Sequence, residues 1–242
     1  MDIKLTSQSF LLPLFLLFTL TVNEFIKKGD ECYLEREDWK KAKEAKRYYE
    51  EAIRLDSNNY EGYWRLAKVI YFLADNLPKK EKEKFLKEGI EIAKKAIKLN
   101  SNRAEGHFWY ASLLGAYAEM KGIRGFSYLE EIKKEFNLAL KCDSTVEDGS
   151  AYTALGRMYY QLPSFVGGSL EKSLLYLLKA KIISPNNPYT KLYLADTYLA
   201  LKKKEEAKRE LEELIQMKEE KKWLPEIRKL KEKAREKIKE IK

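Results

Sequence analysis

Four segments of the sequence share one pattern, and this repetition limits the fold more than any other feature. They read YYEEAIRLDSNN (48–59), EIAKKAIKLNSN (91–102), EFNLALKCDST (135–145) and YLLKAKIISPNN (176–187). Each has the apolar spacing of a helix end, followed by a short polar turn. The shared position holds a small residue in every copy: Ala52, Ala96, Ala139 and Ala180. Small residues let two helices approach closely, and Asn, Asp and Ser favour helix ends. Such repetition predicts a helical solenoid.

The intervals between copies predict three enlarged turns. A fifth, weaker copy (208–217) places Leu214 at the shared position, and successive intervals are 44, 43, 41 and 34 residues. The additional residues fall at 75–84, 120–127 and 161–169, between the two helices of a unit. We therefore expect these three turns to lie along one edge of the array. In the last turn, Gly167 and Gly168 permit a positive φ, and Ser169 suits the N-cap of the following helix.

Each copy is followed by a second helical pattern, and here a family resemblance emerges. The residues Tyr152, Leu155, Gly156 and Tyr159 fit W-x2-L-G-x2-Y with Tyr in place of Trp. This resembles the tetratricopeptide repeat, a helix-turn-helix unit of about 34 residues. The expected fold class is therefore all-α, a tetratricopeptide-like array of about four to five hairpins. Residues 24–222 would form the repeat domain, and residues 223–242 a C-terminal capping helix with Pro225 in its first turn.

A narrower resemblance covers roughly residues 40 to 215. It depends on EGHFWYASLLGAYAEMKGI (105–123), on LPSFVGGS (162–169) and on ISPNNPYTKLYLADTYL (183–199). These stretches are similar to bacterial envelope repeat proteins of the TRAP-transporter T-component type and to the repeat domain of regulators of microtubule dynamics. The transporter resemblance implies a helical array with a pore or concave cleft that works with a solute-binding partner. The chain lacks the lipobox cysteine usual in that type, so attachment by lipid is not expected.

The N-terminal segment, residues 1–23, predicts a signal peptide or a membrane anchor. Lys4 gives a weakly positive start, and an apolar run follows from Phe10 to Leu20. This run is short for a membrane span and suits a signal-peptide core, with cleavage after Thr21. The alternatives are an uncleaved anchor or a buried helix of the mature fold. An exported protein, periplasmic or anchored to the cytoplasmic membrane and facing outward, is the expected location.

Several side chains are candidates for binding a ligand or partner: His107, Trp109, Tyr117, Tyr160, Pro163, Phe165, Gly167 and Gly168. His107 is the single histidine and has no neighbours at zinc-ligand spacing, so simple packing and hydrogen bonding is its alternative role. The aromatic residues, with Tyr63 and Tyr71, either fill the core or line a groove. Phe165, at a turn tip, either faces a cleft or partner or plugs a gap between its own helices.

The motifs and the charge pattern of the sequence argue against several classes of function. No nucleophile motif or phosphate loop occurs, so no enzyme activity, cofactor or metal is expected. Cys32 and Cys142 match no metal or redox spacing. The formal net charge is +9, and the last 41 residues hold 16 Lys or Arg against 11 Glu. Their signs alternate, which is typical of a solvated helix face and not of a nucleic-acid surface.

These observations predict a non-enzymatic scaffold of the cell envelope. Its partner would be a protein, for example a solute-binding protein, or a small solute, and it could serve as an accessory of a TRAP-type transporter. The membrane would be contacted only through the N-terminal segment. The alternative is a cytoplasmic or membrane-anchored assembly adaptor without a small-molecule ligand.

Overall fold

The computed structural model describes the backbone of residues 11–241 and the side chains of residues 21–241. The α-helices of this part are α1 (Leu11–Leu34), α2 (Trp39–Leu55), α3 (Tyr60–Asp75), α4 (Lys79–Leu99), α5 (Ala104–Lys121), α6 (Leu129–Cys142), α7 (Val146–Gln161), α8 (Leu170–Ile183), α9 (Pro188–Ala200), α10 (Lys204–Gln216) and α11 (Leu224–Glu240). Short 3-10 helices are η1 (Gly122–Tyr128), η2 (Ser164–Val166) and η3 (Lys221–Trp223).

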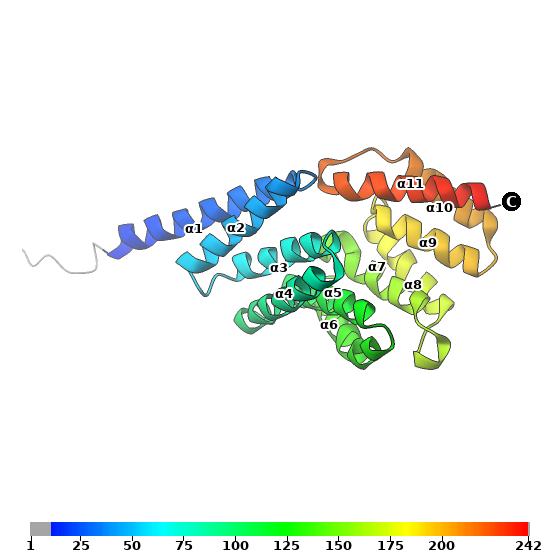
Figure 1. Ribbon diagram of the computed structural model, residues 1–242, viewed down its shortest axis with the longest axis horizontal. Helices are drawn as coiled ribbons and strands as arrows, with labels where there is room; N and C mark the ends of the chain where they lie inside the picture. Colours follow the sequence, from blue (N-terminus) through cyan, green and yellow to red (C-terminus); the bar gives the residue numbers. More distant parts are fainter. Residues whose placement is uncertain (1–10, 242) are drawn as a thin grey trace, which may run out of the picture.

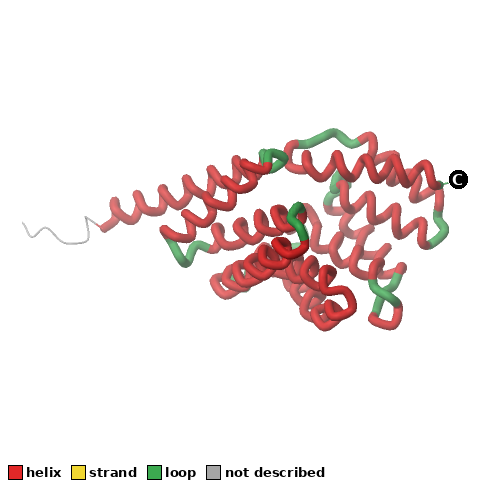
Figure 2. The backbone as a smooth tube through the Cα atoms, in the orientation of Figure 1, coloured by secondary structure: helices red, strands yellow, loops and turns green. Residues whose placement is uncertain are grey.

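Successive helices pair into five antiparallel hairpins, from α1–α2 to α9–α10, and α11 follows the last hairpin (Figure 1). No strand occurs in the described part of the chain (Figure 2). The expected all-α hairpin array is therefore confirmed.

The shared position of the repeat has the predicted role at helix ends and crossings. Ala52, Ala96, Ala139 and Ala180 are fully buried, as is Leu214 in the fifth copy. In the four alanine copies, the polar residue four positions later donates its backbone N–H to the alanine carbonyl at 2.8–3.0 Å. This bond ends the helix, because the donor residue itself leaves the helical conformation. The same short motif thus sets both the length of the helix and the closeness of its crossing.

The glycine of the repeat signature is explained by close packing. A Cβ atom built on Gly156 would lie 2.6 Å from Leu177 Cγ, which is on the other helix of the same hairpin. A side chain at this position would push α7 and α8 apart. Gly156 is therefore required by the approach of the two helices.

The enlarged turn between α7 and α8 forms largely as expected. Ser169 accepts a hydrogen bond from the Lys172 backbone at 3.1 Å and so caps α8. Gly167 has a φ of 95°, in the left-handed region. The prediction was wrong for Gly168, which has no positive φ. Gly168 is needed for another reason, since a Cβ there would lie 1.8 Å from the Leu162 carbonyl oxygen.

Helix α1 passes through the predicted boundary between residues 23 and 24. Its C-terminal part packs in the first hairpin, where Val22 and Ile26 are buried. The expected features at Lys4 and in the whole apolar run lie outside the described side chains, so the signal or anchor stays a prediction. Within the described residues, no helix has both the length and the apolar character that crossing a membrane requires.

The C-terminal segment closes the array into a ring. Helix α11 covers α9 and α10, and its beginning lies beside the α1–α2 turn (Figure 1). There Arg36, a residue that is only 4% exposed, donates from its guanidinium to both oxygens of Glu226 at 2.7 and 3.1 Å and to the Lys222 carbonyl. Exposed ion pairs flank this contact, namely Lys221 with Glu35 and Arg228 with Glu37. Residues about 190 positions apart thus join the two ends of the repeat array.

Candidate functional site: the central cleft

The ring encloses a cleft with a volume of about 1480 Å³. The inner helices α3, α5, α7 and α9 form its walls, and the beginning of α11 borders it on the remaining side. Residues of all three enlarged turns border it, among them Asn76, Ile123 and Pro163. The expectation that these turns share one edge is therefore consistent with their common position at the cleft.

Small residues on α5 and α7 hollow out the cleft. Ser112 and Gly115 on α5 and Ser150 and Ala154 on α7 all line it. A Cβ atom built on Gly115 would meet no atom within 4 Å. Helical positions that would ordinarily carry larger side chains are therefore left open, and the cleft owes its size to these residues.

Aromatic rings form much of the remaining wall. Residues of this kind come from every part of the ring: Tyr33, Trp39, Tyr71, Phe72, Trp109, Tyr189, Tyr193 and Trp223. Tyr71 keeps 36% of its surface accessible, yet protein surrounds it on most sides because the cleft is deep. This desolvation raises the pKa of Tyr71 well above its usual value. Desolvation also raises the pKa values of Tyr189 and Tyr193. These three hydroxyls are neutral donors at physiological pH.

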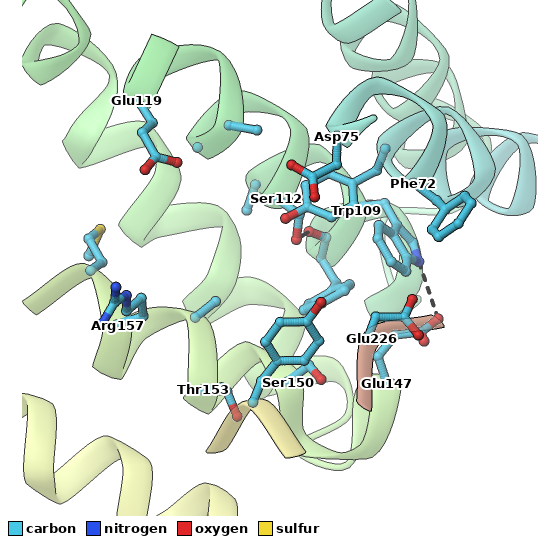
Figure 3. Close-up of a pocket in the computed structure, with 18 of the residues that line it drawn as sticks. Phe72, Asp75, Trp109, Ser112, Glu119, Glu147, Ser150, Thr153, Arg157 and Glu226 are labelled. Carbon is cyan, nitrogen blue, oxygen red and sulfur yellow. Dashed lines mark hydrogen bonds between the residues drawn. The ribbon is translucent and has the colours of Figure 1, made fainter. Parts of the chain in front are cut away.

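One wall carries a cation held between a carboxylate and aromatic rings. Lys68 Nζ binds both oxygens of Glu147 at 2.8 and 3.0 Å and lies 5.6 Å from the centre of the Trp109 ring. The indole N–H of Trp109 donates to the same carboxylate at 3.2 Å, as Figure 3 shows. The charges of this wall are therefore neutralised internally, and the rings are fixed in place.

A left-handed stretch at the start of α7 positions Glu147. Glu147, Asp148 and Gly149 have φ values of 48°, 55° and 71°. Non-glycine residues in this region cost about 1–2 kcal/mol each. The stretch aims Glu147 at Lys68, and it places Asp148 2.8 Å from Lys222 Nζ. A costly backbone conformation thus serves the contacts that hold the cleft wall.

The opposite side carries Arg157 and Glu119 (Figure 3). Arg157 donates to Asp196 at 2.8 Å and stacks 4.5 Å from the centre of the Tyr193 ring. Glu119 lines the cleft, is exposed, and forms no ion pair with any described residue. The cleft therefore presents aromatic surface, largely neutralised ion pairs, the available Glu119 carboxylate and, on α11, the exposed Lys229 and Lys233, which form no ion pair with a described residue.

The structure distributes the predicted site residues over several places. Trp109, Pro163 and Tyr71 line the cleft. Tyr117 packs at 5.8 Å against Tyr128, and the Tyr160 ring lies 5.0 Å from Arg157, but neither borders the cleft; nor does Tyr63. Lys68, Glu119, Glu147 and Arg157 were missed, because isolated charges on a helix carry no sign of the face they occupy. The signal available for Glu147 was Gly149, two residues after it in EDGS.

His107 is buried away from the cleft and makes two hydrogen bonds. Its Nδ1 lies 2.5 Å from the Glu135 carboxylate, and its Nε2 lies 2.9 Å from the Ser101 carbonyl. Both partners are acceptors, so a doubly protonated ring satisfies both contacts. The hydrogen bond to Glu135 accordingly raises the pKa of His107. The packing role foreseen as the alternative for this residue is what the structure shows.

We expect this pair to make stability depend on pH. The folded-state pKa of His107 lies above the unfolded value of about 6.5, so its stabilising contribution is complete below that pH and is lost as pH rises through the folded-state pKa. Urea unfolding of the wild type and of His107→Gln should therefore give a stability difference that shrinks with rising pH. NMR titration of the single imidazole gives the pKa directly. A value below about 6.5, or a difference that grows with pH, contradicts this assignment.

Phe165 is 82% exposed and does not border the cleft. A ring that plugged a gap between α7 and α8 would be buried, so the structure excludes that role. Phe165→Ser is expected to change the free energy of unfolding by no more than about 0.5 kcal/mol. Phe136→Ala, at a buried ring, should cost about 3–5 kcal/mol in the same urea titration. A loss of about 2 kcal/mol or more for Phe165→Ser would show that the ring is buried after all.

Among the described residues, no group of three or more His, Cys, Asp or Glu side chains is placed to hold a metal ion. Cys32 and Cys142 are both free thiols.

Comparisons with known proteins identify the fold and the family. The chain matches the crystal structure of TTC0263, a thermophilic TPR protein of Thermus thermophilus, with 15% identity over 90% of this chain and 98% of that chain, at a TM-score of 0.66. Pseudomonas aeruginosa PilF gives 19% identity over 93% of each chain and a TM-score of 0.57. At these identities the likeness shows the fold alone. No curated protein matches the sequence.

The family profile described as regulator of microtubule dynamics protein 1-3 matches residues 25–166, which is more than half of the chain. This span includes the C-terminal part of α1 and all of α2 to α7, and with them the cleft walls on α3, α5 and α7. The closed hairpin ring is a tetratricopeptide-type fold, and the chain belongs to the regulator of microtubule dynamics protein 1-3 family.

Proposed function

We propose that the protein is a non-enzymatic scaffold that binds a short segment of a partner protein in the central cleft. The observation that carries this proposal is the half-open, aromatic-walled cleft of about 1480 Å³. Small-molecule pockets usually measure about 300–1,000 Å³, so the cleft exceeds what one small solute fills. Aromatic residues are the commonest anchors of protein interfaces.

The charges of the cleft specify the segment further. The Lys68–Glu147 and Arg157–Asp196 pairs are satisfied within the protein, and they offer little to a charged ligand. Glu119 lines the cleft and has no ion-pair partner among the described residues. Lys229 and Lys233 also line the cleft without an ion-pair partner among the described residues. A segment with apolar or aromatic side chains, a basic group for Glu119 and an acidic group for these lysines meets these conditions.

Position 115 offers a direct test, because its Cβ direction is open. Peptides would be selected from a random display library on the purified full chain and then measured by fluorescence anisotropy. Gly115→Trp fills the cleft and should weaken binding by about tenfold or more. Gly115→Ala is the matched control: it should keep the affinity and stabilise α5 by about 0.5–1 kcal/mol. Enrichment of no peptide, or equal affinity for Gly115→Trp, contradicts the proposal.

A small solute is the second candidate, favoured by the Tyr- and Trp-lined enclosure. A role as an accessory of a TRAP-type transporter would belong to this candidate. Equilibrium dialysis against pools of small metabolites distinguishes the two. If a solute binds, Gly115→Trp abolishes that binding and no peptide binds, the ligand of the cleft is a small solute.

A place in the cell envelope is part of the proposal, supported by the apolar run from Phe10 to Leu20. Residues 1–26 fused to a reporter should carry it across the membrane. A reporter that stays in the cytoplasm would favour the adaptor alternative and leave the cleft proposal untouched.

A further inference from the structure

Helix α8 differs from its counterparts at three positions on the outer face of the array. Counted from the shared repeat position, these are the residues five before, two before and two after it. On α8 they are Leu175, Leu178 and Ile182, with 53%, 38% and 83% of their surfaces exposed.

The other four hairpins provide an internal control. The equivalent positions carry charged or amide side chains: Arg47, Glu50 and Arg54 on α2, Glu91, Lys94 and Lys98 on α4, Lys134, Asn137 and Lys141 on α6, and Arg209, Glu212 and Gln216 on α10. All twelve are exposed. The same backbone position in the same fold is therefore polar wherever it faces water. Three aliphatic side chains at this place on α8 indicate a contact surface.

The spacing of the three residues suits one partner helix. Leu175, Leu178 and Ile182 are separated by three and then four residues, which is the a/d spacing of a helix–helix seam. The seam spans two turns of α8 and has the width of a single helix. An amphipathic helix laid along α8 would cover it with its own apolar stripe.

The charge on one flank of the seam is positive and available, while Glu171, one turn before Leu175, accepts a hydrogen bond from the Ser169 hydroxyl at 2.8 Å. Lys172 and Lys179 are seven residues apart and lie on one side of it. Their ammonium groups lie 5.4 Å from the Tyr159 ring and 5.9 Å from the Tyr176 ring, and neither forms an ion pair with a described residue. Lys181, in contrast, is bound to Glu210 at 2.6 Å. Acidic side chains on the flank of a partner helix would complement Lys172 and Lys179.

We propose that the outer face of α8 is a second docking site, separate from the central cleft, for an amphipathic helix of a partner protein with acidic flanking residues. A second copy of this chain fits less well, because a symmetric antiparallel contact centred on the seam would place the two Lys179 side chains beside each other. A bilayer also fits less well. A flat surface would also meet the polar outer side chains of α6 and α10, so only three apolar side chains could enter the bilayer.

The test uses the full chain and two synthetic helical peptides of about three heptads. Both carry leucine at the seam positions, and the flanks are glutamate in one and lysine in the other. We expect the glutamate peptide to bind about tenfold tighter than the lysine peptide in fluorescence anisotropy.

Two variants identify the surface responsible. Leu175→Lys/Leu178→Asn/Ile182→Lys transfers the residues of α6 to α8, so it should fold normally and lose the binding of the glutamate peptide. Lys172→Glu/Lys179→Glu should reverse the preference between the two peptides. Arg209→Ala/Glu212→Ala, at equivalent positions on α10, is the matched control and should change neither affinity. Circular dichroism melting confirms that each variant is folded.

Equal binding by the wild type and the α6-residue variant overturns the proposal. A second outcome also overturns it. If the wild type sediments with vesicles of equal parts phosphatidylcholine and phosphatidylserine and the α6-residue variant does not, the face binds a bilayer. Light scattering that shows a dimer in the wild type and a monomer in the variant would assign it to a second copy. Because none of these readouts involves position 115, failure here leaves the cleft proposal standing.

Discussion

Replacing Arg36 with alanine is expected to lower the free energy of unfolding by about 3–5 kcal/mol, the usual effect of removing one partner of a buried ion pair. The Arg36 side chain is 3% exposed and that of Glu226 is 15% exposed, so the carboxylate would lose its partner in a largely dry place. The Lys222 carbonyl would lose a donor as well. The measurement is urea unfolding monitored by circular dichroism.

The change should also alter the cooperativity of unfolding. In an open repeat array each unit contacts only its neighbours, and the ends can unfold separately. A closed ring couples the ends, so the wild type should show one transition and Arg36→Ala a broader or divided one. Arg54→Ala is the control, because its side chain is 68% exposed and pairs with Glu51 one turn away. Equal effects of the two substitutions would mean that the ring contact does not contribute to stability.

Ala180→Leu is expected to destabilise the protein by about 1–3 kcal/mol, because a larger side chain overpacks a close helix crossing. Ala180 has no exposed surface, and its carbonyl accepts the bond that ends α8. Thermal melting and urea titration both measure the effect. Lys141→Leu adds a leucine at an exposed position of α6 and should stay within about 0.5 kcal/mol of the wild type. An unchanged melting curve for Ala180→Leu would mean that the repeat alignment is wrong.

The hairpin array could be predicted because its determinants are local and repeated. A small residue at a fixed position, a polar residue four places later and a polar turn recur in the sequence, and each has the predicted bond or burial. The enlarged turns followed from the lengths of the intervals alone. Gly168 was assigned the wrong role, because a close approach to a carbonyl and a positive φ both select glycine.

The cleft was harder to predict because it depends on contacts between distant segments. Arg36 and Glu226 are 190 positions apart, and nothing local pairs them. Without that closure, the sequence could not tell which side of each helix faces an enclosed space. Trp109 was found because tryptophan is rare in the chain, with four in all. Lys68, Glu119 and Arg157 resemble the many surface charges of a chain that is 35% charged.

The apolar seam on α8 could be predicted from the sequence, whereas the closure of the ring could not. Leu175, Leu178 and Ile182 stand at fixed offsets from Ala180, and aligning the repeats places them opposite charged or amide residues in every other copy. Comparing the copies only at the shared small position does not reveal these three residues. Comparing outward positions between repeats identifies such surfaces, because each repeat serves as a control for the others.

Closure of the ring, on which the cleft and its proposed function depend, is tested most directly by chemical cross-linking. Glu35 and Lys221 are exposed, and their charged groups lie 3.3 Å apart. With cysteine at both positions and Cys142 replaced by serine, a short bis-maleimide should join the two ends within one folded molecule. The linked product should migrate faster in denaturing gels, and the yield should fall when Arg36→Ala is added. A folded monomer that forms no intramolecular cross-link would contradict the closed ring.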